Sequence, residues 1–225
     1  PDMTTAKKDV DLKKEQAATL ARPRRSCGIL ARMLFWGMDV AHGKALTLPK
    51  VKLLEILARI PYQAWEIRQY GRMNSRYADD STVAEAREVI QWGRAAQDNE
   101  FWHLRVITER MRKLNVRESA FHRFITPIAV FKYTLFSRLL ACVSIRSAFL
   151  LNAEFEDHAE HEYMEFVKDH PELENEPVDS EAAKEYGNFA SWADVFRRIG
   201  LDERDHMNDS LVHCGRAGEV VPYGE

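Results

Sequence analysis

Two short segments of the sequence place a histidine three residues after a glutamate: Glu100 with His103, and Glu203 with His206. On a helix, residues three apart project from one face, so each segment can offer a carboxylate and an imidazole to the same metal ion. One such pair is common by chance and is then more often a surface pair. Two pairs in one chain indicate a metal site much more strongly.

Two further glutamates lie in helix-like sequence upstream of the two pairs. Glu55 is surrounded by leucine and isoleucine, where a carboxylate must find a cation or a proton, because an unpaired buried charge costs on the order of several kcal/mol. The alternative is that Glu55 pairs with Lys52 or Arg59 on a wet helix face. Glu156 lies upstream of the pair Glu203 and His206, as Glu55 lies upstream of the pair Glu100 and His103.

The segment around Glu156 contains several competing ligands. Helical periodicity alone cannot choose among them, and a solvated face with pairs four residues apart would explain them equally well. The competing side chains are Glu154, His158, Glu160, His161 and Glu162.

A glutamate from each of two helices and a Glu-x-x-His turn from each of two others is the ligand set of carboxylate-bridged di-iron or di-manganese bundles. The three cysteines, Cys27, Cys142 and Cys214, are far apart and form no zinc or iron–sulfur pattern. No segment alternates as a strand would. We therefore predict an all-α fold, a ferritin-like di-iron four-helix bundle with extra amphipathic helices at a membrane surface.

Prolines, caps and apolar periodicity predict where the helices lie. Pro61 should kink the second helix, and Ser81 or Thr82 should cap the third, with Glu85 completing a capping box. The predicted helices are 28–41, one that starts at 48, one that starts after the cap and ends near 114, an apolar one over 124–151 that continues through a bend to 169, 181–186, and 192–213.

The sequence predicts three regions. Residues 1–27 form a basic arm, partly helical at best, which either wraps a partner or extends into solvent. Residues 28–215 form the helical bundle domain, and residues 216–225 form a C-terminal tail. The formal net charge of −3 gives no reason to expect nucleic acid as a partner.

The apolar segment 124–151 is the nearest candidate for a membrane helix. It lacks a run of about 18 uninterrupted apolar residues, the length that an ordinary spanning helix needs. Lys132, Arg138 and Arg146 interrupt it. A helix that is apolar on a wide face and basic on the other can lie in a membrane interface without crossing it. A buried core helix is the alternative.

The motifs resemble, in order, those of the alternative oxidases, the cyanide-insensitive quinol oxidases. Leu53-Leu54-Glu55 with the later Pro61 resembles their first motif, and Asn99-Glu100-Phe101-Trp102-His103-Leu104 the second. Phe155-Glu156-Asp157-His158-Ala159, with Tyr163 in register, is similar to the third. Asp202-Glu203 with His206 is similar to the last. The resemblance extends from about 28 to 213.

The resemblance implies a two-iron centre that couples the oxidation of ubiquinol to the four-electron reduction of oxygen to water. It implies a homodimer on one leaflet of the mitochondrial inner membrane, on the matrix side, with 28–41 and 124–151 facing lipid. Tyr163 corresponds to a redox-active tyrosine. The implied quinol contacts are Asp39, Lys50, Leu54 and Ala159, and the implied iron ligands are Glu55, Glu100, His103, Glu156, Glu203 and His206.

Several positions depart from the family pattern. Lys50 and Phe35 stand where the family has arginines that line its quinol pocket, and lysine keeps the charge but not the planar fork. Asp157 and His158 replace two acids of the third motif. Gly200 and Met207 replace two further arginines. The metal ligands are thus retained while the quinol pocket is altered.

The sequence is also compatible with two other functions. The fold can serve as an accessory subunit of a larger inner-membrane respiratory complex, docked through the arm and the apolar helices, in which the quinol site is degenerate. A related di-iron hydroxylase of quinone biosynthesis fits the motifs less well.

Overall fold

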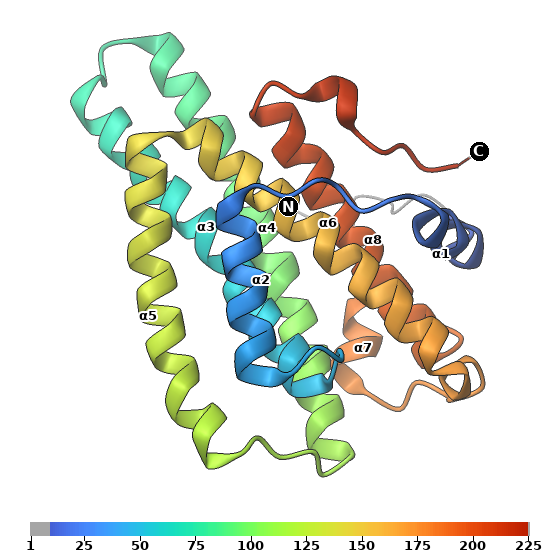
Figure 1. Ribbon diagram of the computed structural model, residues 1–225. Coiled ribbons are helices and arrows are strands. Elements are labelled where there is room, and N and C mark those ends of the chain that lie inside the picture. Colours follow the sequence, from blue (N-terminus) through green and yellow to red (C-terminus); the bar gives the residue numbers. More distant parts are fainter. Residues whose placement is uncertain (1–9, 225) are drawn as a thin grey trace.

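The structure, a computed structural model, describes residues 10–224, and every regular element within that range is helical (Figure 1). The α-helices are α1 (Leu12–Ala21), α2 (Ile29–His42), α3 (Leu48–Ser75), α4 (Asp80–Lys113), α5 (Ala120–Val143), α6 (Ile145–Asp169), α7 (Glu181–Tyr186) and α8 (Trp192–His213). Two single turns of 3-10 helix, Pro171–Glu174 and Ala217–Glu219, follow α6 and α8. The all-α prediction is confirmed for the described part of the chain.

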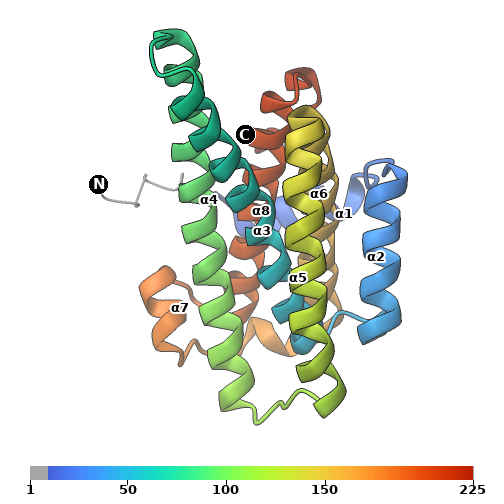
Figure 2. The same cartoon turned by 90° about the vertical axis from the view of Figure 1, so that its left-hand side faces the viewer.

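Four long helices form the centre of the molecule. Helix α3 packs along α4, and α6 packs along α8. Helix α5 packs on the outside of α3 and α6, and α2 contacts α6 and α3 from a neighbouring side. The ends of α3 and α4 that are joined by their loop project beyond the other helices (Figure 2).

The start of α4 differs from the prediction. Asp79, not Ser81 or Thr82, is the N-cap, and its carboxylate accepts hydrogen bonds from the backbone N–H groups of both residues. Their hydroxyl groups donate to the same carboxylate. Aspartate caps a helix as well as serine does, and here the two hydroxyl groups reinforce it. Helix α3 passes through Pro61 and continues to Ser75.

The predicted apolar helix 124–151 is two helices. Ser144 adopts an extended conformation, with φ −153° and ψ 99°, which ends α5 at Val143. The Ser144 side chain accepts a hydrogen bond from the N–H of Ser147 and so caps α6. The apolar residues up to Leu151 therefore belong to a bundle helix and not to the outer one. The predicted bounds 181–186 and 192–213 are confirmed.

The N-terminal arm packs on its own chain. Residues 1–9 of the predicted arm lie outside the described residues, but α1 contacts both α6 and α8. Arg22 pairs with Asp157 at 2.5 Å and with Glu160 at 2.7 Å. Arg204 of α8 pairs with Glu160 at 2.9 Å and also with Glu15 of α1. The prediction of a solvated tail is therefore wrong for residues 10–27, because buried ion pairs hold them.

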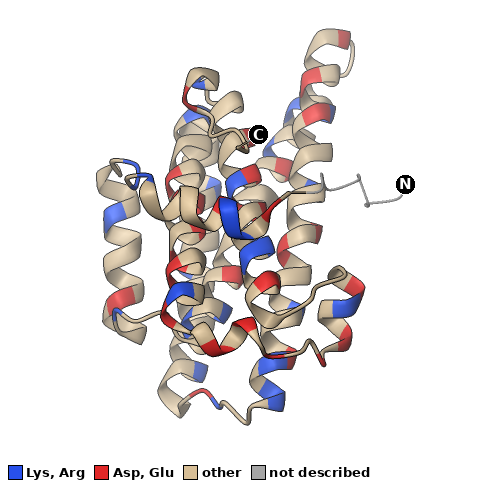
Figure 3. Cartoon of the chain, turned by 90° about the vertical axis from the view of Figure 1, so that its right-hand side faces the viewer, with Lys and Arg blue, Asp and Glu red and all other residues tan. Residues whose placement is uncertain are grey.

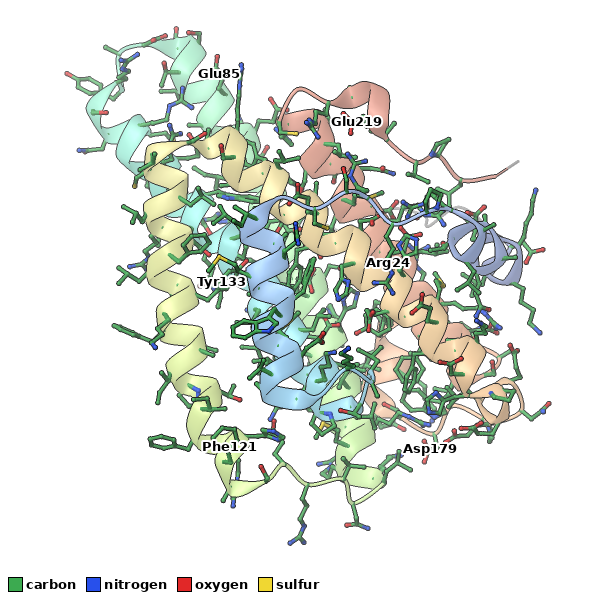
Figure 4. The ribbon with its side chains drawn as sticks, viewed as in Figure 1. Arg24, Glu85, Phe121, Tyr133, Asp179 and Glu219 are labelled. Carbon is green, nitrogen blue, oxygen red and sulfur yellow. The ribbon has the colours of Figure 1, made fainter. Side chains whose placement is uncertain are left out.

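This attachment explains the high charge of α6. Figure 3 looks onto the face where α1 crosses the bundle, and basic and acidic residues lie side by side there. Arg24 extends over α6 and contacts Glu162 and Glu165, both at 2.9 Å (Figure 4). The N–H of Gly28 donates to Glu154 at 3.0 Å, just before α2 begins.

Candidate metal centre

The structure brings together all six side chains that the sequence marked as metal ligands. Their ligand atoms form two groups, and within each group the atoms lie within 4.8 Å of one another. The first group contains Glu55, Glu100, His103 and Glu203, and the second contains Glu100, Glu156, Glu203 and His206. Glu100 and Glu203 belong to both groups.

Each of the four central helices contributes to the cluster. Helix α3 supplies Glu55 and α6 supplies Glu156, while α4 and α8 each supply a Glu and a His one turn apart. The four glutamates and His103 are fully buried, and His206 is 6% exposed. Lys52 pairs with Glu118 and Arg59 lies over the ring of Phe101, so neither partner proposed for Glu55 on a wet face contacts it.

The two shared glutamates lie between the two histidines. Nδ1 of His103 is 3.5 Å from Oε2 of Glu100 and 3.1 Å from Oε1 of Glu203. Nδ1 of His206 is 2.8 Å from Oε1 of Glu100 and 3.4 Å from Oε2 of Glu203. Each shared carboxylate thus directs one oxygen toward each histidine, which is the arrangement of a carboxylate that bridges two ions.

The hydrogen bonds of the four glutamates also separate the two shared ones, Glu100 and Glu203, from the other two. Glu55 accepts a hydrogen bond on Oε1 from Tyr163, and Glu156 accepts on Oε1 from Tyr62 at 3.1 Å, while Oε2 of each has no hydrogen-bond donor among the described residues. Apart from the contacts between carboxylates and histidines within the cluster, both oxygens of Glu100 and of Glu203 lack hydrogen-bond partners among the described residues, as do the two Nδ1 atoms. Buried polar atoms with no partner outside their own cluster are rare in native proteins, and metal ligation explains all eight of these atoms.

The charge of the cluster also fits a pair of divalent ions. Four ionised carboxylates carry four negative charges, which two divalent cations balance while both histidines remain neutral. A ligand set of carboxylates and imidazoles without thiolate favours iron or manganese. The residues therefore fit a pair of such ions.

Without metal, protons must take the place of the ions. Burial raises the pKa of Glu55 to about 8, although His103 beside it acts in the opposite direction. Burial, together with Glu203 and Glu100, raises the pKa of Glu156 well above its usual value. These carboxyl groups bind a proton readily in the folded protein unless a cation replaces it.

A second ring of polar groups orients His103. Its Nε2 lies 3.3 Å from Oδ2 of Asp202, and the same carboxylate oxygen accepts hydrogen bonds from Asn99 at 3.0 Å and from the hydroxyl of Tyr186. Arg198 pairs with the other oxygen of Asp202 at 2.6 Å. A carboxylate on the remote ring nitrogen fixes the ring and leaves Nδ1 for a metal.

Glu156 is oriented by two residues that the sequence reasoning did not identify. Asn152 donates to Oε1 of Glu156 at 3.0 Å, to Tyr62 at 3.0 Å and to Ser210 at 3.1 Å. Asn152 lies one turn before Glu156, so its spacing could have indicated it. Nothing in the local sequence indicates Tyr62, because a packing contact between α3 and α6 brings it there.

Tyr163 is the only residue predicted as catalytic, and it contacts the cluster. Its hydroxyl donates to Oε1 of Glu55, and the side chain is 1% exposed. Burial and the neighbouring carboxylates, Glu55 first, raise its pKa well above the usual value. The phenol is therefore neutral, and its hydroxyl proton forms a hydrogen bond to Oε1 of Glu55, one of the predicted metal ligands.

The other ionisable residues of α6 do not reach the cluster. Glu160 pairs with Arg22 and Arg204, and His158 stacks on Phe35 with ring centroids 4.0 Å apart and contacts Arg24. His161 contacts the backbone carbonyls of Asp157 and Arg22. The structure thus resolves the choice among competing ligands that periodicity left open.

The four predicted quinol contacts lie near one another but do not line an open site. Lys50 is 2% exposed, and its ammonium donates to Asp39 at 2.7 Å and to the carbonyls of Gly43 and Lys44 at 3.0 Å each. Leu54 and Ala159 are buried in the apolar cluster between α2, α3 and α6. All three donors of Lys50 are therefore already in use.

An apolar cavity of about 250 Å³ lies beside these residues, between α2, α3 and α5. Met33, Met38, Leu53, Leu57 and Tyr133 are among its lining residues. Tyr133 points from α5 toward α2 (Figure 4). None of the four predicted quinol contacts lines this cavity.

Two of the departures from the resemblance have structural roles. Met207 is fully buried and packs with Ala153 and Leu211. Gly200 permits close contact, because a Cβ there would lie 3.0 Å from Cε of Met164 and 3.1 Å from Cβ of Tyr163. These positions therefore belong to the packing between α6 and α8 and could not hold an arginine unchanged.

No protein-family model matches this sequence, and no curated protein matches it either. The described residues form a helical bundle whose buried glutamate and histidine clusters can hold metal ions.

Proposed function

We propose that the protein is a di-iron quinol oxidase of the alternative-oxidase type, built as a ferritin-like bundle and attached to one leaflet of a membrane. The observation that carries this proposal is the division of the glutamate oxygens. Glu100 and Glu203 direct their two oxygens toward opposite histidines and have no other hydrogen-bond partner, whereas Glu55 and Glu156 each have one oxygen that accepts from a tyrosine and one that does not. This is the pattern of two bridging and two terminal carboxylates.

The residues of the chain have distinct roles in this proposal. The two shared glutamates would hold both ions, and His103 and His206 would each ligate one ion through Nδ1. When bound, a pair of irons would supply the binding and four-electron reduction of oxygen to water. The hydroxyl of Tyr163 donates a hydrogen bond to Glu55, and this contact would let Tyr163 pass an electron and a proton toward the centre. The buried position of all these groups excludes bulk water.

The apolar cavity supports a quinol as the substrate. It lies against α3, where Leu53 and Leu57 line it while Glu55, between them in sequence, belongs to the metal cluster. A quinol ring with an isoprenoid tail, as in ubiquinol, is a largely apolar ligand for which such a cavity is suited. Asp39, Lys50, Leu54 and Ala159 do not line this cavity, so in this proposal they lie behind its wall and support it on the side of α2 and α6.

The surface of α2 and α5 supports attachment to a membrane. Exposed apolar side chains recur along α5 at Phe121, Phe124, Phe131, Leu135 and Leu139, each at least 59% exposed. Phe121 points away from the bundle (Figure 4). By length and composition α5 is also the one described helix that could cross a membrane.

A position on the surface explains these helices better than a crossing does. Helix α5 runs along α3, which carries a buried ligand, so α5 cannot cross without carrying the bundle with it. On α2, Ile29, Met33, Trp36 and Val40 form a second exposed apolar row. We therefore propose that α2 and α5 lie in one leaflet, as a homodimer on the matrix side of the mitochondrial inner membrane.

Metal analysis and turnover test this proposal. Protein purified from iron-supplemented cells should contain two irons per chain, and the variant E203Q should lose most of this iron while remaining helical. The iron-loaded protein should consume oxygen with ubiquinol in the presence of cyanide. Protein with two irons per chain that oxidises no quinol would rule out the oxidase.

One observation favours a second candidate, an accessory subunit of a larger inner-membrane complex. Lys50 donates its three N–H groups to Asp39 and to two backbone carbonyls, so none is available to a quinol oxygen unless the side chain rearranges. In this case the chain should purify with foreign subunits and should show no quinol turnover. A homodimer that turns over quinol excludes it.

A further inference from the structure

A chain of aromatic side chains connects the metal centre with the molecular surface. Tyr62 starts it, because its hydroxyl donates to Glu156 and its ring centroid lies 5.8 Å from that of His206. The ring of Trp65 lies 4.8 Å from that of Tyr62, with the two rings edge to face. Both Tyr62 and Trp65 are fully buried.

Trp92 of α4 continues the chain to the surface. Its ring lies 4.9 Å from that of Trp65 and 5.9 Å from that of Tyr62. On the other side it stacks on His213, the last residue of α8, with centroids 4.1 Å apart and planes at 12°. Phe149 also contacts His213, at 5.6 Å, but among the described rings that contact His213 only Trp92 is readily oxidised.

The three rings are suited to carry single electrons. Tyrosine and tryptophan have the side chains that lose one electron most readily, and ring-to-ring contacts keep each step short. Nε1 of Trp65 and of Trp92 are buried and have no acceptor among the described residues. An oxidised indole in this setting keeps its proton, so an electron can pass through it without proton movement.

The outer end of the chain adjoins a surface hollow of about 210 Å³. Arg68, Glu88 and His213 are among its lining residues. Arg72 and Glu85 also line it and pair with each other at 3.0 Å, whereas Arg68 has no ion-pair partner in the part of the chain that the structure describes. Glu85 marks this end of the bundle, remote from Phe121 (Figure 4). These side chains suit a small polyhydroxylated anion, because Arg68 can bind its negative oxygen while Glu88 accepts hydrogen bonds from its hydroxyl groups.

We propose that Tyr62, Trp65 and Trp92 form an electron path from an enediolate reductant in this hollow to the metal centre. The path rests on the proposed di-iron function, which supplies the oxidant. It differs from the quinol route, which enters through Tyr163 and the apolar cavity on another side of the cluster. Its role is to return electrons to the centre when quinol does not.

Each step of the path balances. Tyr62 gives one electron to the oxidised centre, and its hydroxyl proton moves to Oε1 of Glu156 along the existing hydrogen bond. An electron from Trp92, directly or through Trp65, restores Tyr62, and the proton returns to it. The enediolate gives one electron to Trp92 and one proton to solvent and becomes its radical anion. In sum the centre gains one electron, and the three rings are unchanged.

The path can be tested without metal. In a metal-free H213C variant whose three native cysteines are changed to serine, a ruthenium tris-bipyridine label at position 213 is flash-oxidised at a pH at which Glu156 has lost its proton and can accept one from Tyr62, and EPR detects the radicals. Oxidation should travel inward through Trp92 and produce a tyrosyl radical. The variant Y62F should abolish this signal, and W92F should lower its yield about tenfold or more. W65F should have a smaller effect, since Trp92 also contacts Tyr62 directly.

Other results would overturn the path. A tyrosyl yield that W92F leaves unchanged, or a signal that survives in Y62F, would show that the electron takes another route. If Trp92 served packing alone, W92F would lower the melting temperature without lowering the yield. Metal content is measured separately, so a protein that binds no iron but forms the Tyr62 radical would refute the proposed oxidase and leave the path intact.

In the iron-loaded protein, mixing the reduced form with oxygen in the absence of quinol should produce a radical that ascorbate removes. The rate of this removal, followed by freeze-quench EPR, should fall about tenfold or more in W92F. With R68Q, the rate of radical removal should depend less strongly on the ascorbate concentration, because the proposed binding cation is lost. The amount of radical formed should not change. Equal removal rates in the native protein and W92F would overturn the outer half of the path.

Discussion

Gly200 of α8 lies directly against Tyr163 of α6, and a Cβ at position 200 would be 3.1 Å from the Cβ of that tyrosine. The same α8 segment carries Glu203, one turn later, into the metal cluster. The distance between α6 and α8 at this point therefore determines both how Tyr163 reaches Glu55 and how Glu203 reaches the histidines. A residue without a side chain permits this approach.

The substitution G200A should therefore destabilise the protein even though alanine favours helices. The added methyl group contacts Met164 Cε at 3.0 Å and Tyr163 Cβ at 3.1 Å, and the latter cannot move without its helix. Overpacking of this kind costs about 1–3 kcal/mol. Urea unfolding measures the cost, and metal analysis should show weaker binding.

Gly71 provides the matched control, since nothing lies within 4 Å of a Cβ built there. It is also a glycine inside a helix, so G71A should stabilise the protein by roughly 0.5–1 kcal/mol. If both substitutions changed the free energy of unfolding equally, the contact between Gly200 and Tyr163 would not limit the approach of α8.

Metal uptake should become stronger as the pH rises from 4.5 toward about 8. Burial raises the pKa of Glu55 from 4.5 to about 8 in the folded, metal-free protein, so the carboxyl must release a proton before it binds a cation. Manganese titrations in weakly buffered solution with a pH indicator should detect this release. The variant E55Q should release fewer protons and bind less tightly across the same range.

The stability of the metal-free protein should change in the opposite direction. A carboxyl whose pKa is raised on folding stabilises the folded state fully below its unfolded pKa, near 4.5, and this contribution is lost as the pH rises through about 8. Melting temperatures of metal-free protein should therefore fall across this range, and the difference from metal-loaded protein should widen. A constant difference would contradict proton–metal exchange at Glu55.

Much of the fold was predictable because its signals are local. Helices α7 and α8 start directly after Ser180 and Ser191, both N-caps whose side chains accept backbone hydrogen bonds. The Glu-x-x-His spacing placed both pairs on bundle helices because three residues are nearly one helical turn. The break at Ser144 was missed because the residues on both sides of it are apolar and helical periodicity continues through it.

The surroundings of the cluster were less predictable because they depend on contacts between distant segments. Asn152 and Tyr62 are 90 positions apart and meet only when α3 packs on α6. Gly200 looked like a lost arginine until the approach of Tyr163 gave it a reason. The sequence could not decide whether the arm wraps a partner or extends into solvent, because its charges, read alone, gave no sign of buried partners such as Glu160.

Removing the buried arginine that holds the arm should be costly. Arg204 is 1% exposed and lies between Glu15 and Glu160, so R204M leaves Glu15 buried without a cation and leaves Glu160 with Arg22 alone. Breaking a buried pair in this way costs about 3–5 kcal/mol. Urea unfolding should show this loss, and limited proteolysis should cleave α1 faster.

Lys184 offers a comparison for the same change to methionine. Its ion pair with Glu181 is on the surface, with the two side chains 57% and 77% exposed. K184M should alter the free energy of unfolding by less than about 0.5 kcal/mol. The double variant R204M/E15Q should recover part of the loss, because it removes the unpaired charge of Glu15 together with its partner, while Glu160 keeps its pair with Arg22. No recovery would mean that packing, and not charge, makes Arg204 important.

Binding to lipid vesicles should depend on the exposed apolar rows of α2 and α5. Trp36 is 70% exposed and Phe131 is 71% exposed, and neither supports the bundle. Burial of such a side chain contributes about 1.5–3 kcal/mol, so W36S/F131S should weaken partition onto vesicles by roughly a hundredfold or more. Tyr77, which is 80% exposed on the turn between α3 and α4, provides the control Y77S. Because Tyr77 lies on neither row, Y77S should bind vesicles as the native protein does. Equal losses in both variants would mean that aromatic exposure in general drives the binding, and the face formed by α2 and α5 would then have no special role.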